Sequence, residues 1–338
     1  MVVGSGTAGA EFLRHYKGEV TVVSPTKYLF CQALFPSYVA GKIEEDELKV
    51  DLQPFFEHRG IIFRKCKVEF VKQKCKTLFS KVKTVRGIGY DICIIAIGGT
   101  NGVYVEGVEK TLSINDFESA KIARKRIEKA KDVVVVGSGM SGVEVAYEIS
   151  DFCNVTLIEA EKRVLPNMCE KASKYVKKLL ENAGVDILTS CKVEKISDTI
   201  MTSCGEIEFD EVLWCTGIVG KRLAGLKYGK YGILVNSSLK AGENIFVIGD
   251  AAEVKSKNGI ATKTALEAER QAKFVAKAIK KDIKNLEYKP FSTIENPFSI
   301  ITLGNRAILV RGNTVISGDI VHKLKNYVVR RFLKNFEV

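Results

Sequence analysis

The chain has 338 residues, of which 46% are hydrophobic and 27% are charged. Its length corresponds to about two domains of roughly 150 residues each, and the composition excludes a largely disordered chain. The formal net charge of +12 suits a nucleic acid, an anionic membrane surface or an acidic protein as partner. No apolar run reaches the ~18 residues of a membrane span, and no charged-then-apolar leader opens the chain. We therefore expect no spanning helix and no secretory signal.

The cysteines and histidines give no pattern of a metal site. Nine cysteines are present, an odd number, and none of them form a CxxC pair. Three histidines are scattered along the chain, at His15, His58 and His322. This usage is typical of reduced thiols in the cytoplasm rather than of a disulfide framework. The sequence therefore predicts no metal site and a cytoplasmic location.

A stretch near the N-terminus recurs 133 residues further on. Residues 2–11 read VVGSGTAGAE, and residues 135–144 read VVGSGMSGVE. Each copy consists of an apolar strand, a GxGxxG turn and a helix, and a second apolar strand follows at residues 20–24 and 155–159. The pattern predicts two βαβ units, here called the first unit and the second unit. We expect an α/β protein with two Rossmann-like dinucleotide-binding domains.

Each glycine of the motif has a separate task. The first makes the tight turn, the second lets the backbone approach a pyrophosphate, and the third lets the helix pack close to the strand. The phosphate then lies on the helix N-terminus, where free N–H groups favour an anion. The candidate residues are Gly4, Gly6 and Gly9 in the first unit and Gly137, Gly139 and Gly142 in the second.

The residue that ends the second strand differs between the units. The second unit has Glu159, 22 residues after Gly137. A carboxylate at this place holds the ribose hydroxyls of NADH and repels the 2′-phosphate of NADPH. The first unit has Ser24, 20 residues after Gly4, which can hydrogen-bond a ribose without carrying charge. We therefore expect the two units to bind different dinucleotides.

Three further strands end in glycine. Residues 91–98 and 211–217 are apolar strands that end at Gly98 and Gly217. Both strands follow the first glycine of their own motif at a similar distance along the chain. Residues 244–252 form a strand that ends in Gly249 and Asp250. A carboxylate at that position can bind the ribityl hydroxyls of a flavin.

Together these features resemble the flavoproteins with paired FAD and NAD(P)H domains. Within them the chain looks like the type II NADH:quinone oxidoreductases, also called alternative NADH dehydrogenases. Residues 28–48 also resemble the sulfide:quinone oxidoreductases, a sister family. Besides the two glycine motifs, the segments that carry the type II resemblance are residues 142–144, 155–166, 211–225, 245–252 and 299–318.

The resemblance implies FAD on the first unit, completed by Asp250, and NADH on the second. It implies an FAD domain over residues 1–112 and 238–290, an NADH domain over 113–237, and a C-terminal piece, 291–338, for dimer, acceptor or membrane contacts. It also places Glu144 near the nicotinamide and the flavin. A helix that starts near Thr264, with Lys263 beside it, could stabilise negative charge on the flavin ring.

Other electron acceptors remain open. The type II pattern has two glutamines on the helix beneath the flavin, and here Leu266 and Arg270 occupy those places. An NADH oxidase or a CoA-disulfide reductase would use Cys31, seven residues after Ser24, as a redox-active thiol. The alternative for Cys31 is an ordinary buried thiol without a redox role. A ferredoxin or rubredoxin reductase and a flavin-binding protein without turnover are further alternatives. Sulfide oxidation is not expected, because no cysteine follows Cys215.

The last segment predicts a basic amphipathic helix from about residue 319 to residue 336. Such a helix can lie in a membrane interface with its cations on anionic lipid, or it can pack on the protein or a dimer partner. The predicted partners are therefore NADH, a quinone or other acceptor, an anionic surface on the inner face of the cell membrane and a second copy of the chain, with no nucleic acid. Apolar residues at helical spacing are Ile320, Leu324, Tyr327, Val328 and Phe332, extended by Val321 and Phe336, and basic residues beside or opposite them are Lys323, Lys325, Arg330, Arg331 and Lys334.

Overall fold

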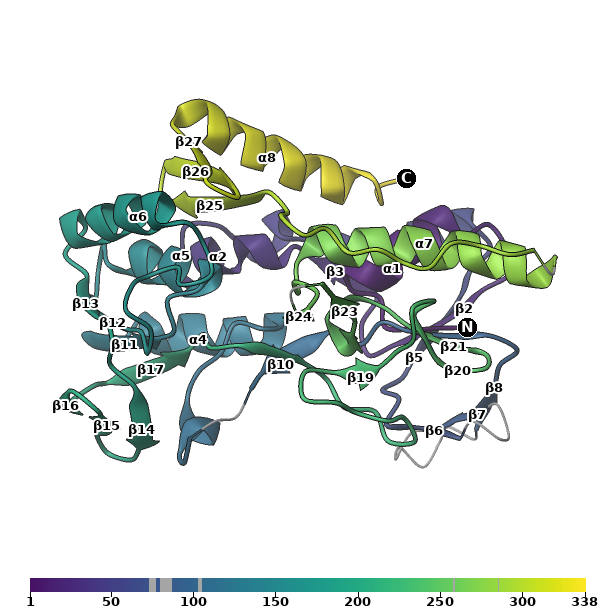
Figure 1. Cartoon of the computed structure of the whole chain (residues 1–338), viewed down its shortest axis with the longest axis horizontal. Coiled ribbons are helices and arrows are strands. Elements are labelled where there is room, and N and C mark those ends of the chain that lie inside the picture. The colour runs from purple at the N-terminus through teal and green to yellow at the C-terminus, as the bar shows by residue number, and fades with distance from the viewer. Residues whose placement is uncertain (73–76, 80–86, 103–104, 258, 285) are drawn as a thin grey trace.

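The computed structural model describes the whole chain except residues 73–76, 80–86, 103–104, 258 and 285. Its first sheet has the strand order β20-β21-β9-β1-β2-β5 (Figure 1). All neighbours in it are parallel except the edge strand β20. The strands are β1 (Val2–Val3), β2 (Thr21–Ser24), β5 (Ile62–Lys65), β9 (Cys93–Ile95), β20 (Lys240–Gly242) and β21 (Ile245–Val247). Because β9 and β21 are neighbours, this sheet is built from two stretches of chain that are far apart in sequence.

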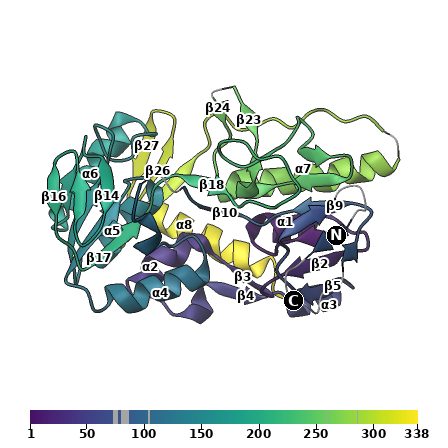
Figure 2. The same ribbon diagram turned by 90° about the horizontal axis from the view of Figure 1, so that it is seen from below.

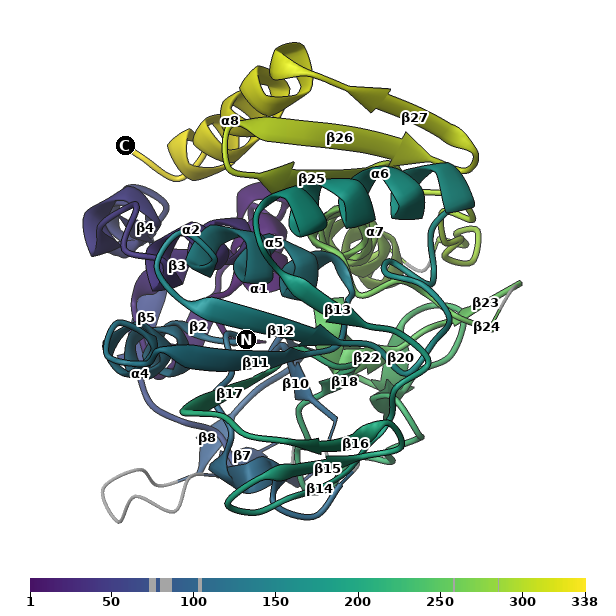
Figure 3. The ribbon, with the colours of Figure 1, turned by 90° about the vertical axis from the view of Figure 1, so that its left-hand side faces the viewer.

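The second sheet has the order β13-β12-β11-β17 and is parallel throughout. Its central strand is a continuous buried run of valines, as expected for a parallel strand covered on both faces. A three-stranded antiparallel sheet, β14 (Val193–Ile196), β15 (Ile200–Thr202) and β16 (Gly205–Ile207), packs on one of these faces (Figure 3). The sheet strands are β11 (Asp132–Val136), β12 (Asn154–Ile158), β13 (Asp186–Leu188) and β17 (Glu211–Trp214).

Helices cover the two sheets. In the first unit, α1 (Thr7–His15) lies against the long helix α7 (Ala265–Ile283). In the second unit, α5 (Met140–Ile149) follows β11 and contacts α6 (Glu170–Asn182). The α/β class expected from the sequence is confirmed. The remaining helices and strands are α2 (Phe35–Val39), α3 (Gln53–His58), α4 (Phe117–Ile127), β3 (Tyr28–Phe30), β4 (Lys49–Asp51), β6 (Phe70–Lys72), β7 (Thr77–Phe79), β8 (Ile88–Gly89), β10 (Gly99–Asn101), β18 (Ile218–Gly220), β19 (Ile233–Leu234), β22 (Ala252–Glu253), β23 (Lys255–Ser256) and β24 (Gly259–Ile260).

The C-terminal piece joins the two units. It consists of the antiparallel strands β25 (Ser299–Leu303), β26 (Arg306–Arg311) and β27 (Thr314–Ser317), followed by α8 (Asp319–Lys334). Viewed from below, α8 runs from the second unit toward the first (Figure 2). Residues of β25 and β26 belong to the hydrophobic core of the second unit. Beyond the other end of α8, Phe336 is buried in the core of the first unit, with its ring centroid 5.6 Å from that of Phe55.

The predicted C-terminal helix is present, but its predicted faces are partly wrong. Val321 and Phe336 are not on the exposed apolar side, because both are buried against the protein. Lys325 is not on a solvated basic side, because it is buried beside a carboxylate described below. Among the described residues, no helix is long and apolar enough to cross a membrane. Four of the predicted apolar residues are exposed, namely Ile320, Leu324, Tyr327 and Val328.

Candidate functional site

The two glycine motifs have nearly the same backbone geometry. Gly4 has a φ of 99° and Gly137 a φ of 97°, a region that favours glycine. A Cβ on Gly9 would lie 2.1 Å from the carbonyl oxygen of Gly4. A Cβ on Gly142 would lie 1.9 Å from the carbonyl oxygen of Gly137. The first and third glycines are therefore required by the close approach of helix and turn in both units.

The middle glycine of each motif borders open space. A Cβ on Gly6 or Gly139 would meet nothing within 4 Å. These two residues are the N-caps of α1 and α5, and neither helix has a side-chain cap. The first N–H groups of both helices therefore have no side-chain cap, and the chain leaves the space beside each middle glycine open.

The serine of each motif reaches the residue that ends the second strand. Ser138 donates from its N–H over 2.9 Å and from its hydroxyl over 2.6 Å to one carboxylate oxygen of Glu159. In the first unit the Ser5 hydroxyl lies 2.9 Å from the Ser24 hydroxyl. Glu159 is buried and held beside the glycine turn, and a carboxylate with its several lone pairs can still accept further hydrogen bonds.

The two strand-end glycines lie where the units cross. Gly98 leads into β10 and Gly217 leads into β18, and these two strands pair antiparallel. The carbonyl of Gly217 accepts from the N–H of Gly102 over 2.9 Å, and that of Gly98 accepts from Lys221 over 3.0 Å. This reciprocal pairing brings the ends of the two parallel sheets together at one place.

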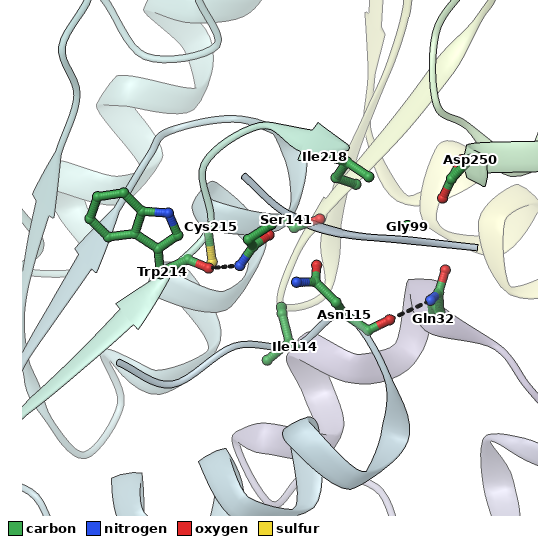
Figure 4. A pocket seen from close by; sticks show the side chains of 10 residues that line it. Gln32, Gly99, Ile114, Asn115, Ser141, Trp214, Cys215, Ile218 and Asp250 are labelled. Carbon is green, nitrogen blue, oxygen red and sulfur yellow. Dashed lines mark hydrogen bonds between the residues drawn. The ribbon is translucent and has the colours of Figure 1, made fainter. Parts of the chain in front are cut away.

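A pocket lies at this crossing (Figure 4). The pocket is small, with a cavity volume of about 90 Å³. Gln32 of the first unit donates through its side-chain nitrogen to the carbonyl of Asn115 over 2.7 Å, which ties the segment before α4 to the first unit. The residues that line the pocket are Gln32, Gly99, Asn101, Ile114, Asn115, Ser141, Trp214, Cys215, Ile218 and Asp250.

Asp250 lines the pocket, and Lys263 lies next to it. Burial raises the pKa of the Asp250 carboxyl, and the nearby Lys263 partly offsets this rise. Burial lowers the pKa of Lys263, which donates to the carbonyls of Asp250 at 2.6 Å and Ala252 at 3.0 Å. Thr264 is the N-cap of α7 and accepts from the N–H of Glu267 over 3.3 Å. A half-buried carboxylate that lines a pocket is suited to accept hydrogen bonds from ligand hydroxyls.

Glu144 does not line the pocket. Its carboxylate oxygen accepts from the Lys325 ammonium over 2.6 Å. The same oxygen accepts from the backbone N–H of Thr302 over 2.8 Å and from its hydroxyl over 3.0 Å. The second motif helix is therefore bound to β25 and α8 by a buried ion pair with a threonine between the charges.

Cys31 is buried, and its neighbour Gln32 faces the pocket instead. Burial raises the pKa of the Cys31 thiol to about 11. A thiol in this state is a poor nucleophile at neutral pH. Among the described residues, no three His, Cys, Asp or Glu side chains converge on a metal-like site.

Several residues of the site were not predicted. The buried Trp214 Nε1 and Thr216 Oγ1 have no hydrogen-bond partner among the described residues, and the Trp214 indole packs in the core of the second unit rather than into the pocket. Their signal was available, since both lie at the end of the apolar strand that precedes Gly217. Gln32, Asn115, Thr302 and Lys325 carried no such local signal.

The family model for pyridine nucleotide-disulphide oxidoreductases matches residues 1–279. The chain belongs to this family. The family, the fold class and the enzyme class expected from the sequence are therefore confirmed: the protein is an oxidoreductase that uses a pyridine nucleotide.

Among curated relatives, the type II NADH:quinone oxidoreductase of Staphylococcus haemolyticus is 24% identical over 83% of this chain and 81% of its own length. The external alternative NAD(P)H-ubiquinone oxidoreductase B1 of Arabidopsis thaliana is 26% identical over 75% of this chain, which spans only 55% of that relative. The solved structure of NDH2 from Plasmodium falciparum in complex with NADH has the same fold, with a TM-score of 0.85, 18% identity and coverage of 99% of this chain and 96% of that one.

Proposed function

We propose that this protein oxidises NADH on the second unit, through FAD held by the first unit, and passes the electrons to a quinone. The observation that carries the proposal is the pair of matching glycine turns whose units meet at one pocket. Two dinucleotides bound to these turns would bring their reactive ends toward the same place. The division into an FAD domain over 1–112 and 238–290, an NADH domain over 113–237 and a C-terminal piece over 291–338 is part of this proposal.

The first unit has the groups that FAD needs. Gly4, Gly6 and Gly9 would hold its pyrophosphate, Ser24 its adenosine ribose and Asp250 its ribityl hydroxyls. The N-terminus of α7 would face the flavin ring, since Thr264 caps this helix and Lys263 is bound next to Asp250. When bound, FAD supplies an acceptor for the hydride and a donor of single electrons.

The second unit has the groups that NADH needs. Gly137, Gly139 and Gly142 would hold its pyrophosphate and Glu159 its ribose hydroxyls. Gly217, with a φ of 37°, follows β17, whose end brings Trp214 and Cys215 to the pocket. Hydride transfer depends on the positioning of two rings and on the exclusion of water rather than on an acid or base, which suits a pocket with few titratable side chains.

Glu144 and Lys325 would act as positioning residues. Their ion pair fixes α5, and with it the second phosphate turn, against the C-terminal piece. The pair also places a cation near Cys31, since the charge of Lys325 acts on that thiol.

A quinone is the acceptor named in the relatives, and the exposed face of α8 supports it. Ile320, Leu324, Tyr327 and Val328 point away from the protein, and basic residues flank them. Such a face can bind an anionic membrane, where a lipid-soluble quinone is found. The buried, protonated state of Cys31 argues against the disulfide-reductase alternative.

The test is an acceptor series. The purified protein should be yellow, and NADH without oxygen should bleach it. A menaquinone analogue, oxygen, CoA disulfide and ferredoxin are then added separately to the bleached protein, and the rate of colour return is measured. The proposal requires the quinone to be fastest. Colour return that is fastest with any other acceptor would overturn the quinone assignment, and a colourless protein would overturn the assignment of FAD.

A further inference from the structure

Two cysteines lie close together in the second unit, where the segment before β14 passes the turn between β15 and β16. In the β14–β15 pair, Val193 is opposite Thr202. One position further out, the N–H of Ser203 donates to the carbonyl of Lys192 over 2.9 Å. At Ser203 and Cys204 the chain turns from β15 into β16, because Thr202 pairs with Gly205. This turn places Cys204 beside Cys191, and the Cys204 side chain contributes to the raised pKa of the Cys191 thiol.

A single threonine hydroxyl holds both cysteines in place. The Cys191 thiol lies 3.3 Å from Thr202 Oγ1, and the backbone N–H of Cys204 donates to the same oxygen over 3.1 Å. That hydroxyl in turn donates to the carbonyl of Gly205 over 2.7 Å, which closes the turn. Both cysteines are free thiols in the structure. The structure therefore presents a reduced pair of neighbouring cysteines that share one hydrogen-bond partner.

The two thiols differ in access. Cys191 has no exposed surface, whereas Cys204 is exposed. Burial also raises the pKa of the Cys191 thiol. A reagent from solution therefore meets Cys204 first, and Cys191 is placed to react second.

We propose that Cys191 and Cys204 form a reversible dithiol–disulfide site that is oxidised by low-molecular-weight disulfides. The Cys204 thiolate attacks one sulfur of the small disulfide, forming a mixed disulfide as the first thiolate leaves. Cys191 then gives up its proton and attacks the Cys204 sulfur, forming the protein disulfide and releasing the second thiolate. The two protons end on the two small thiols, so two protein thiols are oxidised and one small disulfide is reduced.

This site is bound directly to the strand end that carries Glu159. The N–H of Cys191 donates to the carbonyl of Glu159 over 2.9 Å, and the N–H of the preceding Ser190 donates to Glu161 over 2.8 Å. Ser190 has a φ of 55°, so the segment already adopts a left-handed turn there. Closing the disulfide pulls on this segment. On the proposed function, in which Glu159 holds the NADH ribose, oxidation should raise the KM for NADH about threefold to tenfold with little change in kcat.

The experiment uses the full chain and glutathione disulfide as the probe. After incubation, free thiols are alkylated and the digested protein is analysed by mass spectrometry. We expect a peptide pair linked through Cys191 and Cys204. The variant Cys191→Ser should stop at one glutathione on Cys204, and Cys204→Ser should leave Cys191 as a free thiol. Cys66→Ser, which removes a partly exposed thiol of the first unit, is the matched control and should still form the link.

Absence of the linked peptide, or of the adduct in Cys191→Ser, would overturn the proposal. This mass readout does not depend on NADH or flavin, so it stands apart from the proposed function. The KM for NADH is then measured before oxidation, after oxidation and after reduction by dithiothreitol. A linked protein with an unchanged KM would overturn the coupling to Glu159 and leave the dithiol site in place.

Discussion

Lys325 of α8 and Glu144 of α5 are 181 positions apart and form a hydrogen-bonded ion pair of 2.6 Å. The exposed fractions of the two side chains are 11% and 9%. Thr302 lies between them, with its hydroxyl 2.6 Å from the ammonium and 3.0 Å from the carboxylate. The C-terminal piece is therefore bound to the second unit by charge as well as by apolar packing.

Removing the cation should destabilise the protein strongly. Lys325→Met leaves the Glu144 carboxylate buried without a counter-charge, and we expect a loss of about 3 kcal/mol in the free energy of unfolding. Urea unfolding measures this loss. Lys323→Met, on the exposed side of the same helix, is the matched control and should change stability by no more than about 0.5 kcal/mol.

The double variant Glu144→Gln/Lys325→Met distinguishes the effect of the unpaired Glu144 charge on stability from the effect of lost side-chain packing. It removes both charges, so it should recover much of the stability lost in Lys325→Met. Equal stability of the single and double variants would show that the charge on Glu144 is not the cause.

The glycine turns could be predicted because their signal is local. A GxGxxG run between an apolar strand and a helix fixes the first and third glycines within ten residues, as Gly4 and Gly9 show. The strand-end residues Ser24 and Glu159 follow from the same spacing. Sequence reasoning therefore predicted the α/β architecture and the geometry of the two glycine turns, and phosphate binding at these turns stays a prediction.

The C-terminal contacts could not be predicted in this way. Lys325 lies among other lysines and arginines, and only the tertiary position of Glu144 distinguishes it from Lys323. The spacing of apolar residues in the sequence also does not decide which side of α8 is buried, because this helix has apolar residues on more than one side. Val321 and Phe336 therefore proved to be buried, whereas Ile320 is 76% exposed.

Glu159 should set the preference for NADH over NADPH. Glu159→Ser removes the charge that repels a 2′-phosphate, so we expect the NADH/NADPH ratio of kcat/KM to fall about tenfold, or ~1.4 kcal/mol. Steady-state kinetics with both donors measures the ratio. Glu161→Ser, an exposed neighbour, should leave it unchanged. An NADPH preference in the parent protein would contradict this role.

Cys31 should be dispensable for NADH:quinone activity. Its thiol is buried, and its pKa of about 11 keeps it protonated at neutral pH. We expect Cys31→Ser to retain kcat within about tenfold, measured with a menaquinone analogue. A loss above ~100-fold, equivalent to ~2.7 kcal/mol, would instead support a disulfide-reductase mechanism.

Asp250 should lower the stability of the flavin-free protein while being needed for flavin retention. Burial raises the pKa of the Asp250 carboxyl in the folded state. The ionised carboxylate therefore destabilises the folded protein at neutral pH. This destabilisation decreases as the pH falls through the raised pKa of the folded state and is lost below the pKa of the unfolded state. Asp250→Asn should therefore raise the Tm of the apoprotein at pH 7, by an amount that shrinks toward pH 4. The same variant should hold less flavin after dialysis. Asp91→Asn, an exposed change, is the control for both measurements.

The exposed side of α8 should bind anionic membranes. Ile320 and Tyr327 are 76% and 60% exposed, so replacing both with glutamate removes apolar contact and adds repulsion without disturbing the core. We expect Ile320→Glu/Tyr327→Glu to lose co-sedimentation with phosphatidylglycerol vesicles and to keep NADH oxidation with a soluble acceptor. Deleting the whole helix would be a poorer test, because it also removes the buried Lys325 and Phe336.

The matched control is Asn313→Glu/Thr314→Glu, which adds the same charge at the exposed turn between β26 and β27. This control should still sediment with the vesicles, since it leaves the apolar side of α8 intact. Added salt should weaken binding of the parent protein, because lysines and arginines on α8 contribute attraction that ions screen. If the parent protein does not sediment, or if the α8 variant sediments as well as the control, the exposed face does not bind membrane and a second copy of the chain becomes the occupant to test, by light scattering.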